Sequence, residues 1–398
     1  MRVPSSLLGL AMLFAGVTCA FVEGTQQSAS QPILFVGTHT RDEGWMVGTG
    51  KGVYTYKIDT SDGSLTPFGV TPVGVNPVFV QGSTKKFSGG KPVLYAVNAV
   101  TDESKTNPGT QTGYVSALTM GSNGTLELLN TLESHGGNPT HISLSANEDF
   151  VVVSNYDGSL AMFPLNADGS LGKESFHQDF PTGSKVVMDQ QAVGHIHSST
   201  WIPNSNHVVA ANLGSDELLQ FELDTKQKTL KSLETVKHPP GSGPRHMAMH
   251  LKRNIAYAVD EISNTVGVYE INKKAALLSN TAMQNITTLP ADFTNKSTAA
   301  DVHLSSDGKF LYASNRGHNS IAIFAVRESD GTLTSLGWES SRGKTPKSFA
   351  IYEDWMVVAN QDSDNMHLFK LNADTGLLTY TGDSYDVGTP ERVYIGNF

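Results

Sequence analysis

The segment "VVVSNYDGSLAMFPLNADGSL" (residues 151–171) contains two apolar runs, with Asp157 and Gly158 between them and a second Asp-Gly pair after them. Short apolar runs separated by Asp-Gly turns are typical of antiparallel strands joined by hairpins. The first run ends at Asn155, and runs with the same ending recur along the chain. This recurrence decides the fold.

Six segments share the pattern of an apolar run, then Asn or Asp, then one variable residue: LYAVNA, VVVSNY, VVAANL, AYAVDE, LYASNR and MVVANQ. The Asn or Asp anchors stand at positions 98, 155, 212, 260, 315 and 360, at intervals of 57, 57, 48, 55 and 45 residues. A period near 50 is typical of a propeller blade. With the alternating runs that follow each anchor, every repeat supplies about four strands.

The two ends of the sequence complete one further repeat. The segments "PILFVGTHT" (32–40) and "KGVYTYKIDTSDGSLT" (51–66) match the later part of a repeat, whereas "TPERVYIGNF" (389–398) matches only its beginning. We therefore predict an all-β fold, a seven-bladed β-propeller over residues 32–398, closed by pairing of the N- and C-terminal segments. Closure leaves no exposed sheet edge. Two domains are less favoured, because no Pro/Ser-rich spacer interrupts the series.

The first twenty residues resemble a secretory signal, with Arg2 at the positive end and small residues at Thr18 and Ala20 before a cleavage position. The apolar run over residues 7–17 is shorter than the roughly 20 residues that span a bilayer. We predict a signal peptide over residues 1–20, a polar segment over 21–31, and a secreted, extracellular protein; a buried N-terminal helix is the alternative. The only cysteine, Cys19, lies in this signal, so no disulfide is expected in the mature chain.

Composition narrows the possible partners. A formal net charge of -10, a pI near 5.7 and scattered Lys and Arg residues argue against a nucleic-acid partner. No other window approaches 18 apolar residues, so we expect no membrane span. We expect a monomer. Sequons at Asn123, Asn285 and Asn295 lie in polar segments, where surface loops carrying glycans are predicted.

Equivalent repeat positions converge on the axis of a propeller, although they are far apart in the sequence. A purely structural position would keep one residue type, but the residue after each anchor varies. We interpret this position as part of a site; its residues are Ala99, Tyr156, Leu213, Glu261, Arg316 and Gln361.

Histidines stand at the start of several upstream runs: His141 in "NPTH", His195 and His197 in "GHIHS", and His246 in "GPRH". On a strand, His195 and His197 would face one side at roughly 6.6 Å separation. Since no third ligand has a known spacing, we favour neutral hydrogen-bonding roles over metal binding. His246 and His250 have the spacing of a helical zinc site, but their pattern is extended and would separate them by roughly 13 Å. We expect no metal and no cofactor.

Other signatures are weak or missing. The sequence contains neither a G-x-S-x-G nucleophile elbow nor an H-E-x-x-H motif. The glycine-rich "GTGKG" (48–52) precedes the strand pattern "VYTYKI", so the helix N-terminus of a phosphate loop is absent from the pattern. We predict a flexible hairpin there.

Considered together, "GPRH" (243–246), "DE" (260–261) and "SNRGHNSIAIF" (314–324) resemble the seven-bladed propeller lactonases. This family includes propeller-type 6-phosphogluconolactonases and fungal carboxy-cis,cis-muconate cyclase. The resemblance runs from "FVGTHT" (35–40) to "VVANQDSDN" (357–365). It implies a funnel site of one His, two Arg and one Glu, which match His197, Arg245, Glu261 and Arg316. The family often has an acidic residue where this chain has Ala99, which implies an altered wall.

The resemblance implies a small lactone as substrate, opened by water attack on the ring carbonyl. Arg245 and Arg316 suit a carboxylate, a phosphate or a developing oxyanion. Both arginines would keep Glu261 ionised, as base or orienting group, with His197 as proton shuttle. The candidate substrate-binding residues are His195, His141, Asn155 and Gln361.

Three alternatives stay open at this point. A muconate-type cycloisomerase would use the same residues, with a substrate carboxylate adding across a double bond. A non-catalytic propeller would bind a protein or a glycan at its rim. In the third alternative these residues have only a structural role: Arg245 and Glu261 form a salt bridge that stabilises the hairpin, and Arg316 bonds to loop carbonyls.

Overall fold

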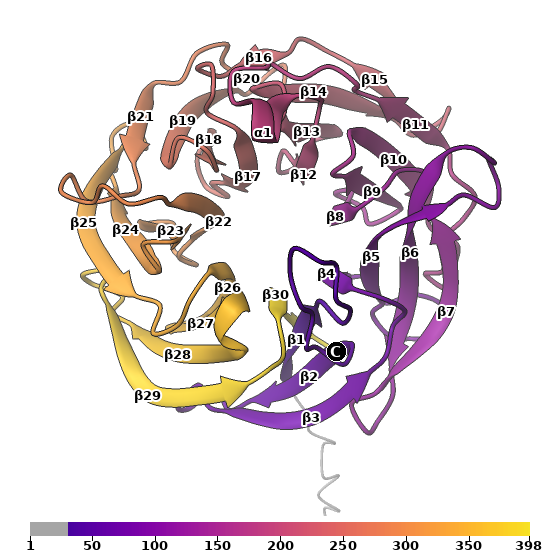
Figure 1. The fold of residues 1–398 in the computed structure, drawn as a ribbon, viewed down its shortest axis with the longest axis horizontal. Helices are drawn as coiled ribbons and strands as arrows, with labels where there is room; N and C mark the ends of the chain where they lie inside the picture. Colours follow the sequence, from indigo (N-terminus) through magenta and orange to yellow (C-terminus); the bar gives the residue numbers. More distant parts are fainter. Residues whose placement is uncertain (1–30) are drawn as a thin grey trace, which may run out of the picture. The chain divides into compact units, whose positions relative to one another are not determined.

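The computed structural model describes residues 31–398, which form seven antiparallel sheets around a central axis (Figure 1). This arrangement confirms the predicted all-β, seven-bladed propeller. The signal peptide predicted over residues 1–20 and nearly all of the segment 21–31 lie outside the described residues. Within residues 31–398 no helix is both long and apolar enough to cross a membrane.

Each blade has an innermost strand beside the axis and three or more strands stacked outward from it. The innermost strands are β4 (Pro77–Gly82), β8 (Pro139–Leu144), β12 (Ile196–Trp201), β17 (Pro244–Met249), β22 (Thr298–Leu304), β26 (Pro346–Tyr352) and β30 (Pro390–Asn397). The second strands are β1 (Pro32–Thr38), β5 (Leu94–Glu103), β9 (Phe150–Asn155), β13 (His207–Asn212), β18 (Ile255–Asp260), β23 (Phe310–Arg316) and β27 (Trp355–Asn360), and all of them except β1 carry an anchor.

The alternating runs after the anchors form the outer half of each blade. The third strands are β2 (Val53–Ile58), β6 (Gln111–Met120), β10 (Ser159–Pro164), β14 (Glu217–Asp224), β19 (Thr265–Asn272), β24 (Ser320–Val326) and β28 (Asn365–Leu371). The outer strands are β3 (Leu65–Thr71), β7 (Leu126–Glu133), β11 (Phe176–Asp179), β15 (Thr229–Ser232), β20 (Leu277–Leu278), β25 (Leu333–Ser340) and β29 (Leu378–Asp386). The short strands β16 (Val236–Lys237) and β21 (Gln284–Thr287) add a fifth strand to two blades.

The seventh blade joins the two ends of the propeller, as the sequence predicted. Strand β1 pairs with β2 on one side and with β30 on the other, in the order β3-β2-β1-β30. The register sets Ile33 opposite Gly396 and Val36 opposite Val393. The first strand of the chain therefore has a partner on each side, and no open edge remains at the closure.

Apolar side chains fill the spaces between neighbouring blades. Tyr95 of β5 and Val151 of β9, for example, belong to one buried cluster although they come from adjacent sheets. Three anchor strands add a tyrosine whose hydroxyl donates to a glycine carbonyl in the next blade. These bonds, all 2.8 Å long, are Tyr95 to Gly169, Tyr257 to Gly331 and Tyr312 to Gly376.

The anchor amides have a structural role. The Nδ2 of Asn155 donates to the carbonyl of Ser134 at 3.0 Å, and that of Asn360 to the carbonyl of Ser341 at 3.0 Å. Asn98 and Asn315 make equivalent bonds to the carbonyls of residues 73 and 288. These four anchors thus tie their strands to the chain that enters each blade, which explains why asparagine recurs at this position.

Two local predictions concern the surface. All three sequon asparagines are exposed, but Asn285 lies in the short strand β21 rather than in a loop. Residues 48–52 precede β2 in the connection between β1 and β2. Backbone bonds from Gly48 to Arg41 and from Gly50 to His39 close that connection as a hairpin.

Candidate active site

Most innermost strands begin with a β-bulge at the same position, one residue after the first. The register shifts between Pro244 and His246 in β17, for example, which leaves Arg245 without a partner across the strand pair. A bulge re-aims the extra side chain, and bulges are common beside active sites. The extra residues that line the central cavity are Val78, Thr140, His197, Arg245, Lys347 and Glu391.

The residues after the anchors form a second set around the same cavity. Ala99, Tyr156, Glu261 and Arg316 line it, whereas Leu213 and Gln361 do not. The cavity has a volume of about 420 Å³. It therefore collects side chains from different blades, as the repeat analysis expected of an axial funnel.

Glu261 holds two arginines from neighbouring blades. Its Oε2 lies 2.9 Å from Nε of Arg245 and 2.8 Å from Nη2 of Arg316. Its Oε1 accepts a hydrogen bond of 3.1 Å from Gln190 in the short helix α1 (Met188–Gln191). The guanidinium groups also donate to backbone carbonyls, Arg245 to Ala300 at 2.7 Å and Arg316 to Ala299 at 3.0 Å. These bonds fix the orientation of both guanidinium planes.

Charge and burial oppose each other in this cluster. Burial alone would raise the pKa of Glu261, but Arg316 and Arg245 more than offset it, and the pKa lies below its ordinary value. Burial, together with Arg316, lowers the pKa of Arg245 to about 10. At neutral pH the cluster is therefore one carboxylate between two cations, which leaves an excess positive charge facing the cavity.

His197 is held neutral in the wall beside this cluster. Burial, followed by the charge of Arg245, lowers its pKa well below the ordinary value. Its side chain lies against the rings of Tyr156 and His246, at centroid distances of 5.7 and 5.3 Å. Within residues 31–398 its buried Nδ1 has no hydrogen-bond partner. An imidazole in this state has a lone pair available to take a proton.

A chain of hydrogen bonds supports Arg245 from behind. Asp301 Oδ1 lies 2.9 Å from Nδ1 of His246, and Nε2 of His246 lies 3.3 Å from Nη1 of Arg245. Burial would raise the pKa of Asp301, but His303, His246 and Arg392 hold it well below its ordinary value, so Asp301 is an ionised acceptor. The Nδ1 of His246 therefore carries the proton, and its Nε2 accepts from Arg245.

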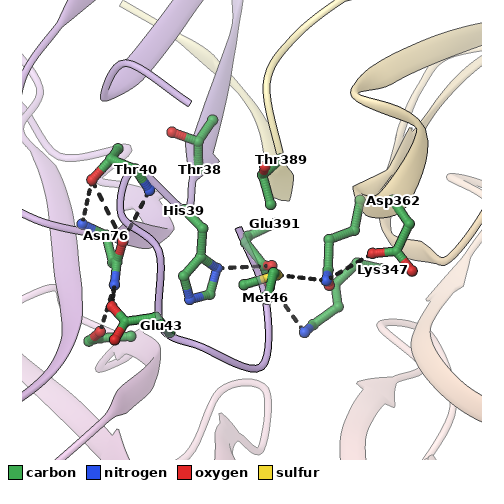
Figure 2. Close-up of polar contacts among 12 residues, drawn as sticks. Thr38, His39, Thr40, Glu43, Met46, Asn76, Lys347, Asp362, Thr389 and Glu391 are labelled. Atoms are coloured by element: carbon green, nitrogen blue, oxygen red, sulfur yellow. Dashed lines mark hydrogen bonds and ion pairs between the residues drawn. The ribbon is translucent and has the colours of Figure 1, made fainter. Parts of the chain in front are cut away.

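The cavity wall carries a second charged cluster, drawn from the closing blade and β26. Figure 2 shows the Glu391 carboxylate between the imidazole of His39 and the ammonium of Lys347. His39 Nδ1 lies 2.9 Å from Glu391 Oε1, and Lys347 Nζ lies 3.2 Å from Glu391 Oε2. Burial would raise the pKa of Glu391, but Lys347 and His39 lower it to about 2. Glu391 is therefore ionised and fixes Lys347 in the cavity wall.

The connection between β1 and β2 brings Trp45 to the same cavity. Asn76 holds this connection: its Oδ1 accepts from the backbone nitrogen of Thr40 at 2.9 Å (Figure 2). The same oxygen accepts from the backbone nitrogen of Arg41 at 3.2 Å. The Trp45 side chain packs against His39 at a centroid distance of 5.9 Å but stays 73% exposed. An aromatic surface therefore stands at the cavity, open to solvent.

The cavity lining is richer in cations than in anions. Arg245, Arg316, Lys347 and Arg392 line it together with the carboxylates of Asp157, Glu261 and Glu391. This contrasts with the whole chain, whose formal net charge is -10. The wall near Ala99 is apolar and includes Val78 and Phe79. The surroundings favour a small molecule that carries a negative charge on one side.

Four of the expected side chains lie around the cavity, whereas the four expected substrate-binding residues do not line it. The imidazole of His195 stacks on the far side of Tyr156, at 4.3 Å, and bonds to its carbonyl at 2.7 Å. His141 packs on Phe79 and lines a separate hollow near Asp301. The Nδ2 of Asn155 donates to the carbonyl of Ser134, as described above.

Gln361 begins the 3-10 turn η1 (Gln361–Ser363) and turns away from the cavity. Its Nε2 bonds to Sδ of Met46 at 2.8 Å and to Oδ1 of Asp362 at 3.1 Å. It thus holds the connection between β1 and β2. In four other blades the equivalent residue lines the cavity, but the turn η1 redirects the chain here.

Sequence reasoning missed His246, Lys347 and Glu391 as site residues. All three stand directly after the first residue or two of an innermost strand, in "PRH", "PKS" and "PER". The repeated proline followed by a charged residue was a usable signal. Alternation alone gave no sign of it, because a bulge breaks the two-residue period.

The comparisons with known proteins agree on one family. Residues 33–395 match the model of the family described as "Lactonase, 7-bladed beta-propeller". A 6-phosphogluconolactonase of Bacillus subtilis (strain 168) is 32% identical over 362 residues, which cover 90% of this chain and 96% of that protein. A 6-phosphogluconolactonase of Formosa agariphila is 34% identical over 87% of this chain and 94% of its own length.

A solved structure gives the same picture. The periplasmic gluconolactonase of Pseudomonas aeruginosa superposes with a TM-score of 0.81 at 29% sequence identity. The match covers 92% of this chain and 99% of that one. The similarity therefore extends over the whole ring, including the blades that build the cavity.

Proposed function

This chain belongs to the lactonase family of seven-bladed β-propellers, and from that membership we propose that it hydrolyses a small, anionic or sugar-derived lactone in the central cavity. The relatives named 6-phosphogluconolactonase and gluconolactonase support a lactone of a sugar acid. The excess of cationic over anionic side chains in the lining favours a substrate with a phosphate or carboxylate group.

One observation carries this proposal: a carboxylate shared by two arginines stands beside a neutral histidine in the same cavity. Lactone opening develops negative charge on the carbonyl oxygen, and preoriented guanidinium groups stabilise such an oxyanion. Arg245 and Arg316 supply that charge without needing to reorganise, because Glu261 and backbone carbonyls already hold them.

His197 takes the proton from the attacking water in this mechanism. Its lowered pKa leaves the imidazole neutral at physiological pH, and general bases of this kind contribute roughly 10² to 10⁴-fold to a rate. Both oxygens of Glu261 already accept hydrogen bonds, from Gln190 and from the two arginines, so Glu261 is less available as a base. Of the two roles considered for it, the orienting role fits better.

We also propose that the protein is exported and acts as a monomer. The signal-like segment over residues 1–20 and the periplasmic relative support export. In a eukaryotic host, glycans on the exposed Asn123, Asn285 and Asn295 would be detected by a mass shift on deglycosylation.

The test is to follow proton release by the purified protein from 6-phosphogluconolactone, gluconolactone and muconolactone. We expect turnover of at least one sugar lactone by the wild-type protein. Glu261→Gln, which keeps the shape but frees both arginines, should reduce kcat/KM by ~10²-fold or more. The exposed Glu222→Gln is the control and should leave it unchanged.

Other outcomes favour the alternatives. Conversion of a carboxymuconate to its lactone, without hydrolysis of sugar lactones, would identify a cycloisomerase. Tight binding of a glycan or a protein, without turnover of any lactone, would identify a binding propeller.

A further inference from the structure

Lys347 is a cation of the cavity wall that the mechanism above does not use. It stands at the bulge position of β26, equivalent to Arg245 in β17, and lines the same cavity. Its side chain is 19% exposed, so the ammonium group has limited access to solvent. The charge of Lys347 therefore belongs to the cavity wall and not to the outer surface of the protein.

The ammonium group is held in one place. Its Nζ lies 3.2 Å from Oε2 of Glu391, and Oε1 of the same carboxylate accepts from His39 at 2.9 Å (Figure 2). An ammonium has three N–H donors, and the described contacts of Lys347 Nζ include only Oε2 of Glu391. The other donors are available to a ligand in the cavity.

Its surroundings also make Lys347 a better proton donor than a solvated lysine. Burial lowers its pKa; Glu391 opposes this effect, whereas the nearby Arg316 and Arg245 add to it. The ion pair with Glu391 keeps Lys347 as an ammonium, and the lowered pKa lets this ammonium release a proton more readily than a solvated lysine does.

Resting on the proposed lactonase function, we propose that Lys347 is the general acid of ring opening, held in position by Glu391 and His39, and donates an Nζ proton to the departing ring oxygen. Arg245 and Arg316 are unsuited to this step, because a guanidinium does not give up its proton at useful rates near neutral pH. Among the cationic Arg and Lys side chains that line the cavity, which are Arg245, Arg316, Arg392 and Lys347, the lysine is the one that can give up a proton.

The step balances as follows. When the tetrahedral intermediate collapses, the bond between the former carbonyl carbon and the ring oxygen breaks, and its electron pair stays on that oxygen. A proton from Lys347 Nζ converts this oxygen into the hydroxyl group of the product. Lys347 then regains a proton from solvent, and His197 returns to solvent the proton that it took from the attacking water. One water is consumed for each lactone.

Leaving-group dependence tests the proposal directly. δ-Valerolactone expels an alkoxide, which needs a proton, whereas dihydrocoumarin expels a phenoxide, which does not. Lys347→Met should therefore reduce kcat/KM for δ-valerolactone and gluconolactone by ~10²-fold or more, but reduce that for dihydrocoumarin by less than ~10-fold. Lys344→Met, in the exposed connection before β26, is the matched control and should change neither.

A second measurement does not depend on the aryl lactone being a substrate. In Lys347→Ala, added methylammonium should restore hydrolysis of gluconolactone in a concentration-dependent manner, since it supplies the missing acid. Equal losses on both lactones together with no rescue by the amine would overturn the proposal.

Two further outcomes would also overturn it. An effect confined to KM for 6-phosphogluconolactone would assign Lys347 to anion binding instead. A wild-type protein that opens no lactone would overturn the proposed function itself, and this inference with it. The two failures are therefore distinguishable.

Discussion

At the scale of single residues, the geometry of Arg245 carries the most consequence. It bonds at once to Glu261, to the carbonyl of Ala300 and to Nε2 of His246. A lysine offers a compact ammonium in place of a planar fork and cannot make these bonds together.

We therefore expect Arg245→Lys to reduce kcat/KM for a sugar lactone by ~10²-fold, although the positive charge is retained. The measurement is steady-state hydrolysis, with circular dichroism to establish that the protein is folded. Activity within a factor of two of the wild type would mean that charge alone is sufficient.

The pair Asp301 and His246 makes a separate prediction. An asparagine at position 246 imitates the Nδ1 contact to Asp301, whereas a glutamine imitates the Nε2 contact to Arg245. If His246 acts by positioning Arg245, His246→Gln should retain more activity than His246→Asn, by about tenfold in kcat/KM.

The pH profile separates this role from simple packing. Burial and Arg245 lower the pKa of His246 to about 4, against the pull of Asp301. Protonation near that pH turns Nε2 into a donor facing Arg245, so activity should fall there in the wild-type protein. The fall should be weaker in His246→Gln, which has no titrating group at this position. Identical acid limbs in the two proteins would contradict the positioning role.

At the scale of elements, a tyrosine hydroxyl connects neighbouring blades. Tyr312 of β23 donates to the carbonyl of Gly376 in the turn before β29, at 2.8 Å. That glycine has φ of 74°, and a Cβ there would collide with Phe310, so the turn needs glycine.

Removing the hydroxyl leaves a buried carbonyl without this donor. Tyr312→Phe should therefore lower the free energy of unfolding by about 1 kcal/mol, measured by the urea midpoint. The partly exposed Tyr352→Phe serves as comparison. A loss no larger than that of the comparison variant would show that the inter-blade bond adds nothing to stability.

The strands and their pairing also show which features of the fold the sequence predicts. The repeat of Asn or Asp anchors predicted the blades, and the split repeat at the two ends predicted the pairing of β1 with β30. The repeat signals are local and periodic, which is why a single sequence contains them. The resemblance to the propeller lactonases pointed to His197, Arg245, Glu261 and Arg316, of which Glu261 and Arg316 also follow an anchor.

The other features of the site arise where the two-residue alternation or the blade repeat is broken. The bulges that turn Lys347 and Glu391 into the cavity are register shifts, which the alternation of apolar residues does not reveal. Gln361 was assigned to the site by its repeat position, but the turn η1 moves it away. His39 and Trp45 reach the cavity through a connection specific to one blade, so no repeat position pointed to them.

At the scale of the whole molecule, the buried titratable groups predict how stability depends on pH. Burial is the main cause that lowers the pKa of His141, His197 and His246 in the folded protein. As the pH falls below about 6.5, the unfolded chain binds protons at these histidines and the folded chain does not. The folded state therefore loses stability.

The carboxylates act in the same direction at lower pH. Glu261, Glu391 and Asp301 have lowered pKa values in the fold, so their contribution is lost as the pH falls through and below about 4.5. We expect Tm to fall from pH 7 to pH 5 and more steeply below that, in a calorimetric series at constant ionic strength. A Tm that is constant or rises between pH 7 and pH 5 would contradict this assignment.

Closure of the ring has one more consequence, for the newborn polypeptide. His39 and Glu391 meet in one cluster although they are 352 positions apart, and β30 is the last strand of the propeller in chain order. While the six intervening blades are being translated, the edge of β1 that later pairs with β30 is unpaired, and it is open to chaperones or to mispairing. Catalysis has to wait as well, because the wall that holds Lys347 is missing its carboxylate until that final strand arrives.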